Sequence, residues 1–313
     1  MATPNLPTVA IISLGSMGIG FARLLLAHSY PVLTSLQDRS PSTRARVSSL
    51  FSSTSPPSSS SSTSASSSSA SSASALTLRC LDTDAELVEA ADVMLSIVPP
   101  EHAHSTAVRI ADAVRTSARG GGEKEGAARK APLYLLDLNA VSPRQARETA
   151  AAVANAAGES VVFIDGGIIG GPPKPPSDPH DPKAAWQRPS IPLSGPHTLD
   201  SLPRGAELAQ VLNVKHVGDE IGKASGLKMC FASMNKGLTA LGIQAFTTAQ
   251  RLGVREELKE HMRVFVPGLH KSVMESLVGM PPKGTYVKST RRKNQRKKER
   301  IIVMYGRCAD ITR

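Results

Sequence analysis

The sequence predicts an α/β fold: a doubly wound sheet followed by an all-α C-terminal domain that is apparently truncated. Two observations predict the sheet. Short apolar runs alternate with segments of helical periodicity up to about residue 165, and glycines occupy the first strand-to-helix turn. A third observation predicts the helical domain, because residues 220–252 contain no proline and are rich in Ala, Leu, Met and Lys.

The first βαβ unit is predicted within residues 8–36. Residues 8–14 form a β-branched apolar run between Pro7 and Gly15, which is typical of a buried parallel strand. Residues 21–28 have apolar side chains at helical spacing, and residues 32–36 supply the next strand.

The later elements continue this alternation around two polar segments. Residues 48–74 are mostly serine and residues 120–130 are polar and glycine-rich, compositions that do not bury apolar surface. We expect strands at residues 76–81, 92–98, 133–138 and 161–165, and helices near residues 83–90, 103–115 and 143–157. After a Pro-rich loop at residues 172–192, we expect late strands at the sheet edge at residues 191–195 and 215–217.

These patterns divide the chain into three parts. Residues 1–218 are predicted as the sheet domain, with low-complexity insertions at about 48–75 and 119–131. Residues 219–283 are predicted as the helical domain, with helices at 220–252 and about 256–278. Residues 284–313 are predicted as a basic, disordered tail.

The composition indicates a globular protein. With 313 residues, of which 40% are hydrophobic, the chain is able to bury one or two cores. No apolar run approaches the roughly 20 residues that span a bilayer, and no secretory signal is evident, so we expect a cytoplasmic protein without a membrane partner. Cys80, Cys230 and Cys308 are far apart, which indicates ordinary thiols. The histidines lack metal-ligand spacing, so no metal is expected.

The net charge of +11 is concentrated at one end of the chain. Residues 283–313 hold 11 of the 37 Lys and Arg residues and 2 of the 26 Asp and Glu residues, so the remainder carries only +2. Such a block is able to bind nucleic acid or to direct nuclear import. Because no aromatic residues interleave the basic ones, we prefer a solvated tail and do not expect nucleic acid as a partner.

The first turn nearly matches a dinucleotide-binding motif. Residues 13–18, SLGSMG, follow the pattern G-x-G-x-x-G with Ser13 at the first glycine. Glycines let such a turn bend and let a pyrophosphate approach the N–H groups of a helix N-terminus. The sequence therefore predicts a Rossmann-like domain that binds a dinucleotide at this turn. The residues expected to bind the cofactor are Ser13, Leu14, Gly15, Ser16, Met17 and Gly18. A loop with incidental glycines is the alternative.

The end of the second strand bears on the choice between NADP and NAD. Asp38 is able to hold a ribose hydroxyl, whereas Arg39, Ser40 and Arg44 are able to hold a 2′-phosphate. Three residues favour the phosphate, so NADP is predicted and NAD is the alternative. The alternative is that these residues lie in a solvated turn and bind no ligand.

Five segments occur in a characteristic order: residues 13–22, 91–100, 137–143 (DLNAVSP), 165–171 (DGGIIGG) and 222–228 (GKASGLK). From about residue 8 to residue 283 the chain resembles the β-hydroxyacid dehydrogenase superfamily, in the branch with a 6-phosphogluconate-dehydrogenase-like C-terminal domain. The resemblance implies an NAD(P)-binding oxidoreductase. Because relatives form symmetric dimers, a homodimer is expected. The oxidoreductase would act on the CH–OH group of a small hydroxy acid or reduce the corresponding carbonyl.

The resemblance also implies roles for particular residues. The nicotinamide ring of the cofactor is expected beside Val98, Pro99 and Pro100, which form the nicotinamide segment. Substrate-side positions are implied for Asn139, Ser142, Asp165, Gly166 and Gly167. The last three match a segment written D-A-P-V-S-G in many relatives, and their backbone donors are able to hold an oxyanion. A glycine-rich turn that serves geometry alone is the alternative.

Lys228 matches the lysine of the family's G-x-G-x-x-x-K signature, with Ala224 at the second glycine. The resemblance implies that it passes a proton to or from the substrate oxygen. Most helix lysines are solvated, but small and apolar neighbours favour partial burial here. Relatives carry asparagine three or four residues later, where this chain has other residue types. Asn235 is the candidate substitute, and Lys236 has a weaker claim.

The chain also departs from the resembling branch after residue 283, where a charged tail replaces the helices that would complete the C-terminal domain. This departure leaves a second function open: a catalytically inactive nucleotide-binding protein with an incomplete substrate domain.

Overall fold

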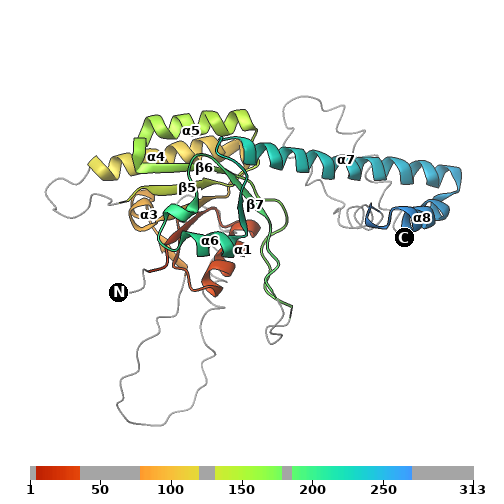
Figure 1. The fold of residues 1–313 in the computed structure, drawn as a ribbon, viewed down its shortest axis with the longest axis horizontal. Coiled ribbons are helices and arrows are strands. Elements are labelled where there is room, and N and C mark those ends of the chain that lie inside the picture. The colour runs from red at the N-terminus through yellow and green to blue at the C-terminus, as the bar shows by residue number, and fades with distance from the viewer. Residues whose placement is uncertain (1–4, 36–77, 120–130, 178–184, 270–313) are drawn as a thin grey trace, which may run out of the picture. The chain divides into compact units, whose positions relative to one another are not determined.

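A computed structural model describes residues 5–35, 78–119, 131–177 and 185–269 (Figure 1). The chain divides into two compact units, residues 1–229 and residues 230–313. The predicted insertion at 48–75, most of that at 119–131 and the predicted tail at 284–313 lie outside the described residues. Within the described ranges, none of the helices combines the length and the apolarity needed to cross a bilayer.

The described strands form one eight-stranded sheet with the order β3-β2-β1-β4-β5-β6-β7-β8. Neighbouring strands are parallel except β6 and β7, which are antiparallel. The first six strands have the order of a doubly wound nucleotide-binding sheet, so the predicted fold class is confirmed. The strands are β1 (Val9–Ile12), β2 (Val32–Ser35), β3 (Leu78–Leu81), β4 (Val93–Ser96), β5 (Leu133–Asp137), β6 (Val161–Gly166), β7 (Ile191–Ser194) and β8 (Val214–His216).

Helices cover both faces of this sheet. α1 (Ser16–Ala27) and α6 (Gly205–Leu212) lie on one face, and α3 (Asp84–Ala90), α4 (Ala103–Arg119) and α5 (Pro143–Ala157) lie on the other (Figure 1). Short 3-10 helices occur at η1 (Pro100–His102), η2 (Gly158–Ser160) and η3 (Leu199–Ser201). Helix α6 was not predicted, because its eight residues are too few for a clear period and it follows Arg204 in the left-handed conformation.

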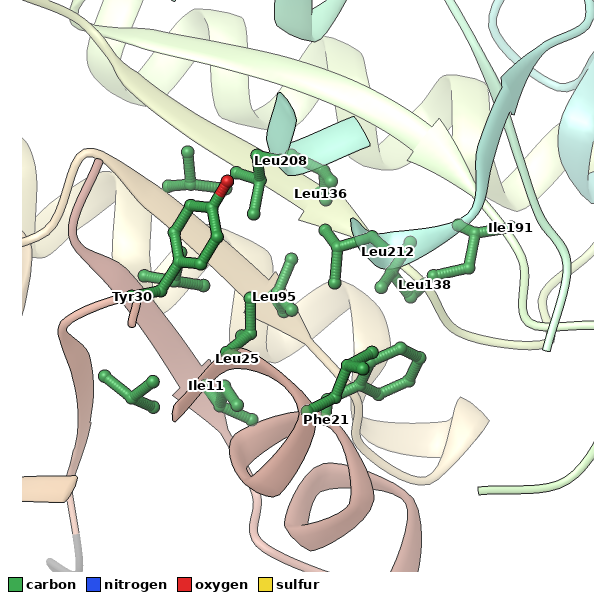
Figure 2. Packing of buried hydrophobic residues seen from close by; sticks show 14 of the residues in the cluster. Ile11, Phe21, Leu25, Tyr30, Leu95, Leu136, Leu138, Ile191, Leu208 and Leu212 are labelled. Atoms are coloured by element: carbon green, nitrogen blue, oxygen red, sulfur yellow. The ribbon is translucent and has the colours of Figure 1, made fainter. Parts of the chain in front are cut away.

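Each face of the sheet buries its own apolar cluster. Figure 2 shows the cluster in which α1 and α6 pack on β1, β4, β5 and β7, through Ile11, Phe21, Leu25, Leu95, Leu136, Ile191, Leu208 and Leu212. The second cluster joins Met94, Leu135 and Phe163 to side chains of α3, α4 and α5. Because both faces are covered, the strands have continuous apolar runs instead of alternating ones.

The helical region consists of α7 (Lys223–Leu252), which begins in the first unit, and α8 (Arg255–Phe265) in the second. The predicted long helix is present as α7. The helix predicted at about 256–278 is interrupted, because α8 ends at Phe265, and residues 270–278 of that prediction lie outside the described residues. Val266 leaves the helical conformation at φ −140° and ψ 57°, and it precedes Pro267, a position where helical backbone is disfavoured. Residues 267–269 are helical again.

Candidate functional site

The turn between β1 and α1 has the backbone of a dinucleotide-binding turn. Ser13 takes the left-handed conformation, with φ 77°, where the motif has its first glycine. Gly18 lies so close to this turn that a Cβ atom there would overlap the carbonyl oxygen of Ser13. Gly18 therefore holds α1 close to β1, as the third glycine of the motif does.

The N-terminus of α1 is open. Gly15 precedes the helix with φ −68°, and no described atom lies within 4 Å of the place where its Cβ would stand. Among the described residues no side chain caps this helix, and its first turn has no acidic residue. Leu14 is buried in the core and Met17 packs against it, while Ser16 is exposed. Such a helix start offers its N–H groups to an anion.

A cavity of about 330 Å³ lies next to this turn, at the carboxyl edge of the sheet. Its lining includes Ile12, Ser35 and Val98, which stand at or just after the ends of β1, β2 and β4. Pro99 also lines the cavity, whereas Pro100 begins η1 and is exposed. Sheets of this type bind ligands in the crevice at the carboxyl ends of strands where the strand order reverses.

Sequence reasoning missed another wall of the cavity, which comes from η1 and α4. His102, Ser105, Thr106 and Arg109 line it, and their spacing places them on one helical face. This i, i+3, i+4, i+7 spacing of polar residues directly after the nicotinamide segment was the signal that could have identified them. Arg109 forms an ion pair with Asp84, which also lines the cavity.

The predicted 2′-phosphate ligands Arg39, Ser40 and Arg44 lie outside the described residues, as does Asp38. Ser35 is the last residue of β2 and lines the cavity. The described part of the chain before these residues therefore ends at the cavity.

Four buried polar side chains form a row across the carboxyl ends of β4, β5, β6 and β7. Ser96 is in register with Asp137, Asp137 with Asp165, and Asp165 with Ser194. Each of the four is at most 2% exposed. Buried polar groups need hydrogen-bond partners, and two networks provide them here.

Asn139 joins one end of this row to the nicotinamide segment. Its side-chain oxygen accepts from the N–H of Val98 at 2.7 Å. Its side-chain nitrogen donates to Oγ of Ser96 at 3.1 Å and to a carboxylate oxygen of Asp137. Asn139 is 3% exposed and its amide group makes three of its four possible hydrogen bonds within the protein, so its side chain supports Val98 instead of facing solvent.

Asp137 is a carboxyl group of this row whose acidity is shifted by burial. Burial raises the pKa of Asp137 to about 6, and the neighbouring carboxylate of Asp165 adds to the effect. Hydrogen bonds from Asn139 lower that pKa and only partly offset the burial. Oδ2 of Asp137 is buried and has no hydrogen-bond partner among the described residues, which disfavours the ionised form.

Asp165 ties the other end of the row to α7. Its carboxylate accepts from Oγ of Ser194 at 2.8 Å and from the N–H of Gly222 at 2.9 Å. It also accepts from Ser225, through the N–H at 3.1 Å and the hydroxyl at 2.5 Å. Oγ of Ser194 in turn accepts from the N–H of Ala224 at 2.9 Å. Side chains at the ends of β6 and β7 therefore bind the first turn of α7.

Lys228 lies one helical turn further along α7, against the segment that follows Asp165. Its ammonium group donates to the carbonyl of Ile168. A Cβ atom at Gly167 would stand 3.0 Å from Cβ of Lys228, so only glycine allows this approach without displacing the lysine. Gly166 is packed more tightly, because a Cβ atom there would stand 2.6 Å from a side-chain carbon of Leu193. The structure thus brings residues 165–168 and Lys228 together.

The remaining predicted residues are Ser142, Asn235 and Lys236. Ser142 is the N-cap of α5, where its hydroxyl accepts from the N–H of Gln145 at 3.2 Å. Asn235 and Lys236 belong to the second unit and are exposed on α7. The carbonyl of Asn235 accepts from the hydroxyl of Thr239 at 2.9 Å.

Cysteine and metal chemistry have no assembled site in the part of the chain that the structure describes. Cys80 and Cys230 are free thiols, and Cys308 lies outside that part. No three His, Cys, Asp or Glu side chains among the described residues are grouped as metal ligands.

Solved structures share this fold. An imine reductase variant from Myxococcus stipitatus, in complex with NAD+, is 15% identical and aligns over 97% of this chain and 88% of its own, with a TM-score of 0.58. A conserved protein of unknown function, described as similar to 3-hydroxyacid dehydrogenases, is 21% identical over 97% and 98% of the two chains, with a TM-score of 0.57. The 3-hydroxyisobutyrate dehydrogenase of Mycobacterium tuberculosis is 16% identical over 84% and 72%, with a TM-score of 0.52.

The TM-scores show that these proteins and this chain have a common fold, that of 3-hydroxyacid dehydrogenase-like proteins. The fold that the five sequence segments implied is therefore confirmed. No protein-family model matches the chain, and no curated protein matches it.

Proposed function

We propose that this chain is an NADP-dependent oxidoreductase that acts on the CH–OH group of a small hydroxy acid or reduces the corresponding carbonyl. One observation carries the proposal: the turn at residues 13–18 leaves the N-terminus of α1 open beside a cavity at the carboxyl edge of a doubly wound sheet. An imine reductase solved with NAD+ and a 3-hydroxyisobutyrate dehydrogenase have the same fold, which supports a nicotinamide cofactor. The proposed compartment is the cytoplasm.

The chain would hold the cofactor at three places. Backbone N–H groups of residues 15–18 would bind the pyrophosphate, because they begin an uncapped helix. The 2′-phosphate of NADP would be held by Arg39, Ser40 and Arg44. If their substitution left the affinity for NADPH unchanged, NAD would be favoured. The nicotinamide segment would border the ring, which supplies or accepts a hydride when bound.

The proton would be handled by Lys228. Its ammonium group would donate to the carbonyl oxygen during reduction, and the neutral amine would accept the hydroxyl proton during oxidation. Asn235 is proposed to assist from α7. Ser142 and the segment 165–167 are proposed to border the substrate, with Asn139 acting beside them through the nicotinamide segment.

A nucleotide-binding protein without turnover is the second candidate. Two observations favour it. The ammonium group of Lys228 is bonded to a main-chain carbonyl, and Phe231 and Ala232 stand where relatives carry an asparagine. Nucleotide affinity without hydride transfer over a broad panel of hydroxy acids and carbonyls would establish this candidate.

We also propose that a second copy of this chain covers α7. Phe231, Met234, Leu238 and Leu241 recur at intervals of three and four residues, and three of them are between 48% and 66% exposed. Between residues 229 and 250 the only charged residue of the helix is Lys236. Sedimentation analysis of Met234→Glu and Leu241→Glu should show monomers where the native protein is dimeric, and a native monomer would contradict this proposal.

The central test is a titration of purified protein with NADPH and NADH, followed by nicotinamide fluorescence. We expect NADPH to bind more tightly, Arg39→Ala to remove that preference, and Lys228→Ala to leave both affinities unchanged while abolishing turnover. If neither nucleotide binds the folded protein, the proposed oxidoreductase function is wrong.

A further inference from the structure

Asp165 is a buried carboxylate, and among the described residues no positively charged side chain donates to it. It is 1% exposed, and its donors are two hydroxyl groups and two backbone N–H groups. Burial of a charge is costly unless hydrogen bonds and dipoles compensate for it. Here the compensation comes from the N-terminus of α7, a helix of 30 residues whose dipole favours a negative charge at this end.

The hydrogen bonds of Asp165 point to a role within the protein. The carboxylate accepts four hydrogen bonds, three at Oδ2 and one at Oδ1. All four donors belong to the end of β7 and the start of α7, and the side chain is 1% exposed. A role as a substrate ligand therefore fits Asp165 less well than a role in holding α7.

The first turn of α7 is fixed from two sides. On the sheet side, Asp165 and Ser194 accept from Gly222, Ala224 and Ser225. On the side of α5, a Cβ atom at Gly222 would come within 3.1 Å of a main-chain oxygen of that helix, and the glycine has φ 104°. This glycine is required by both its conformation and its close approach.

Lys228 follows Ser225 by three residues and so lies one turn above the anchored amides. The strand end that anchors the helix continues directly into the segment that contacts the lysine. Gly167 packs against the stem of Lys228, and the carbonyl of Ile168 accepts from its ammonium group. One continuous segment therefore determines the place of the helix and the place of its lysine.

We infer that Asp165 is a positioning residue for Lys228, and that it acts with Ser194 by anchoring the first turn of α7 to the ends of β6 and β7. Within the proposed function, on which the catalytic meaning of this inference rests, Asp165 sets where the proton-transferring group stands at the border of the substrate site.

The test reads the environment of Lys228 directly, in the full chain without nucleotide. Competitive labelling with acetic anhydride, followed by peptide mass spectrometry, gives the reaction rate of Lys228 relative to the exposed Lys215. We expect Asp165→Asn to raise this ratio about tenfold, the equivalent of one lost ordering hydrogen bond. Asp200→Asn, an exposed aspartate on η3, is the matched control and should leave the ratio unchanged.

Ser194→Ala keeps the carboxylate and removes one bridge to α7, so it should raise the ratio by a smaller factor, about threefold. This variant carries the test if Asp165→Asn does not fold. An unchanged ratio in a folded variant, or an equal rise at Lys174 and Lys228, would overturn the inference. The second outcome would show general loosening of the protein.

Failure of the proposed function can be distinguished from failure of this inference, because the labelling needs neither nucleotide nor substrate. If neither nucleotide binds but the ratio responds, Asp165 still positions Lys228 and only the oxidoreductase proposal falls. Where turnover is found, Asp165→Asn should lower kcat without changing the Kd for NADPH. It should have no further effect in the Lys228→Ala background, because residues that act through each other are not additive.

Discussion

Two of the helices that begin at the carboxyl edge of the sheet, α1 and α7, differ in how the N–H groups of their first turns are hydrogen-bonded. Gly15 precedes α1 without a side-chain cap among the described residues, and no described atom lies within 4 Å of the place of its Cβ. The first turn of α7 is closed, because Asp165 and Ser194 accept from three of its N–H groups. Both helices follow glycine-containing turns, so the sequence pattern alone does not separate them.

The difference indicates how the two helix starts are used. An open helix start retains N–H groups and a partial positive charge for an anionic ligand. At a closed start these N–H groups are already bonded within the protein, so they fix the position of the helix and of Lys228. Substitutions in the turn before α1, in the row between the two helices and at the open end itself test this difference.

The largest effect is expected from Gly18→Ala. Its methyl group would overlap the carbonyl oxygen of Ser13, so α1 has to move away from β1. We expect a loss of about 3 kcal/mol or more in the free energy of unfolding, measured in urea. Gly237→Ala is the control, because no described atom lies near that position of α7, and it should stabilise by about 0.5–1 kcal/mol. Equal effects of the two variants would contradict the close packing of this turn.

The next effect concerns Asp137, in the row between the two helices. Its pKa is about 6 in the folded chain and 3.8 when unperturbed, so the folded state binds this proton more tightly. The cost of ionising it is absent below about pH 4, grows as the pH rises, and is complete above about pH 6. By linkage this contribution removes roughly 3 kcal/mol of stability between about pH 4 and pH 8.

Asp137→Asn abolishes this titration. The free energy of unfolding of the variant should therefore rise relative to the native protein as the pH increases, by up to roughly 3 kcal/mol. Urea denaturation at several pH values measures the difference between the two curves. A difference that is independent of pH would show that Asp137 is not perturbed.

Gly15→Asp would close the open helix. The backbone at this position is extended, with ψ −174°, as an N-cap requires, and a side chain has room there. The new carboxylate should keep or slightly raise the stability of α1, while it repels the pyrophosphate and lowers nucleotide affinity by roughly 100-fold or more. Gly15→Ala adds a side chain without the charge, so its affinity should lie much closer to that of the native protein. Titration with NADPH compares them, and full affinity in Gly15→Asp would place the pyrophosphate elsewhere.

Much of the fold could be predicted because its signals are local. Apolar runs, helical periodicity and the glycines of the first turn indicated every described strand and the helices α1, α3, α4, α5 and α7. Helix α6 was too short to show a period, and the break before Pro267 was overlooked.

The polar row was not predictable, because Ser96, Asp137, Asp165 and Ser194 become neighbours only through strand register. Asp165 was identified as a site residue, but its four donors come from residues 29 to 60 positions away.

Ser13 gives the smallest and most specific expected effect. A serine with φ 77° is strained by about 1 kcal/mol, a cost that glycine avoids. Glycine also loses more conformational freedom on folding, so Ser13→Gly should stabilise by only about 0.5 kcal/mol. Ser29, with φ 66° just after α1, has the same backbone strain away from the turn, and Ser29→Gly should give a similar gain. If only Ser13→Gly also changes the affinity for NADPH, the hydroxyl of Ser13 takes part in holding the nucleotide. If neither variant changes it, the left-handed backbone at Ser13 suffices for the turn and the serine replaces the expected glycine at a cost in stability alone.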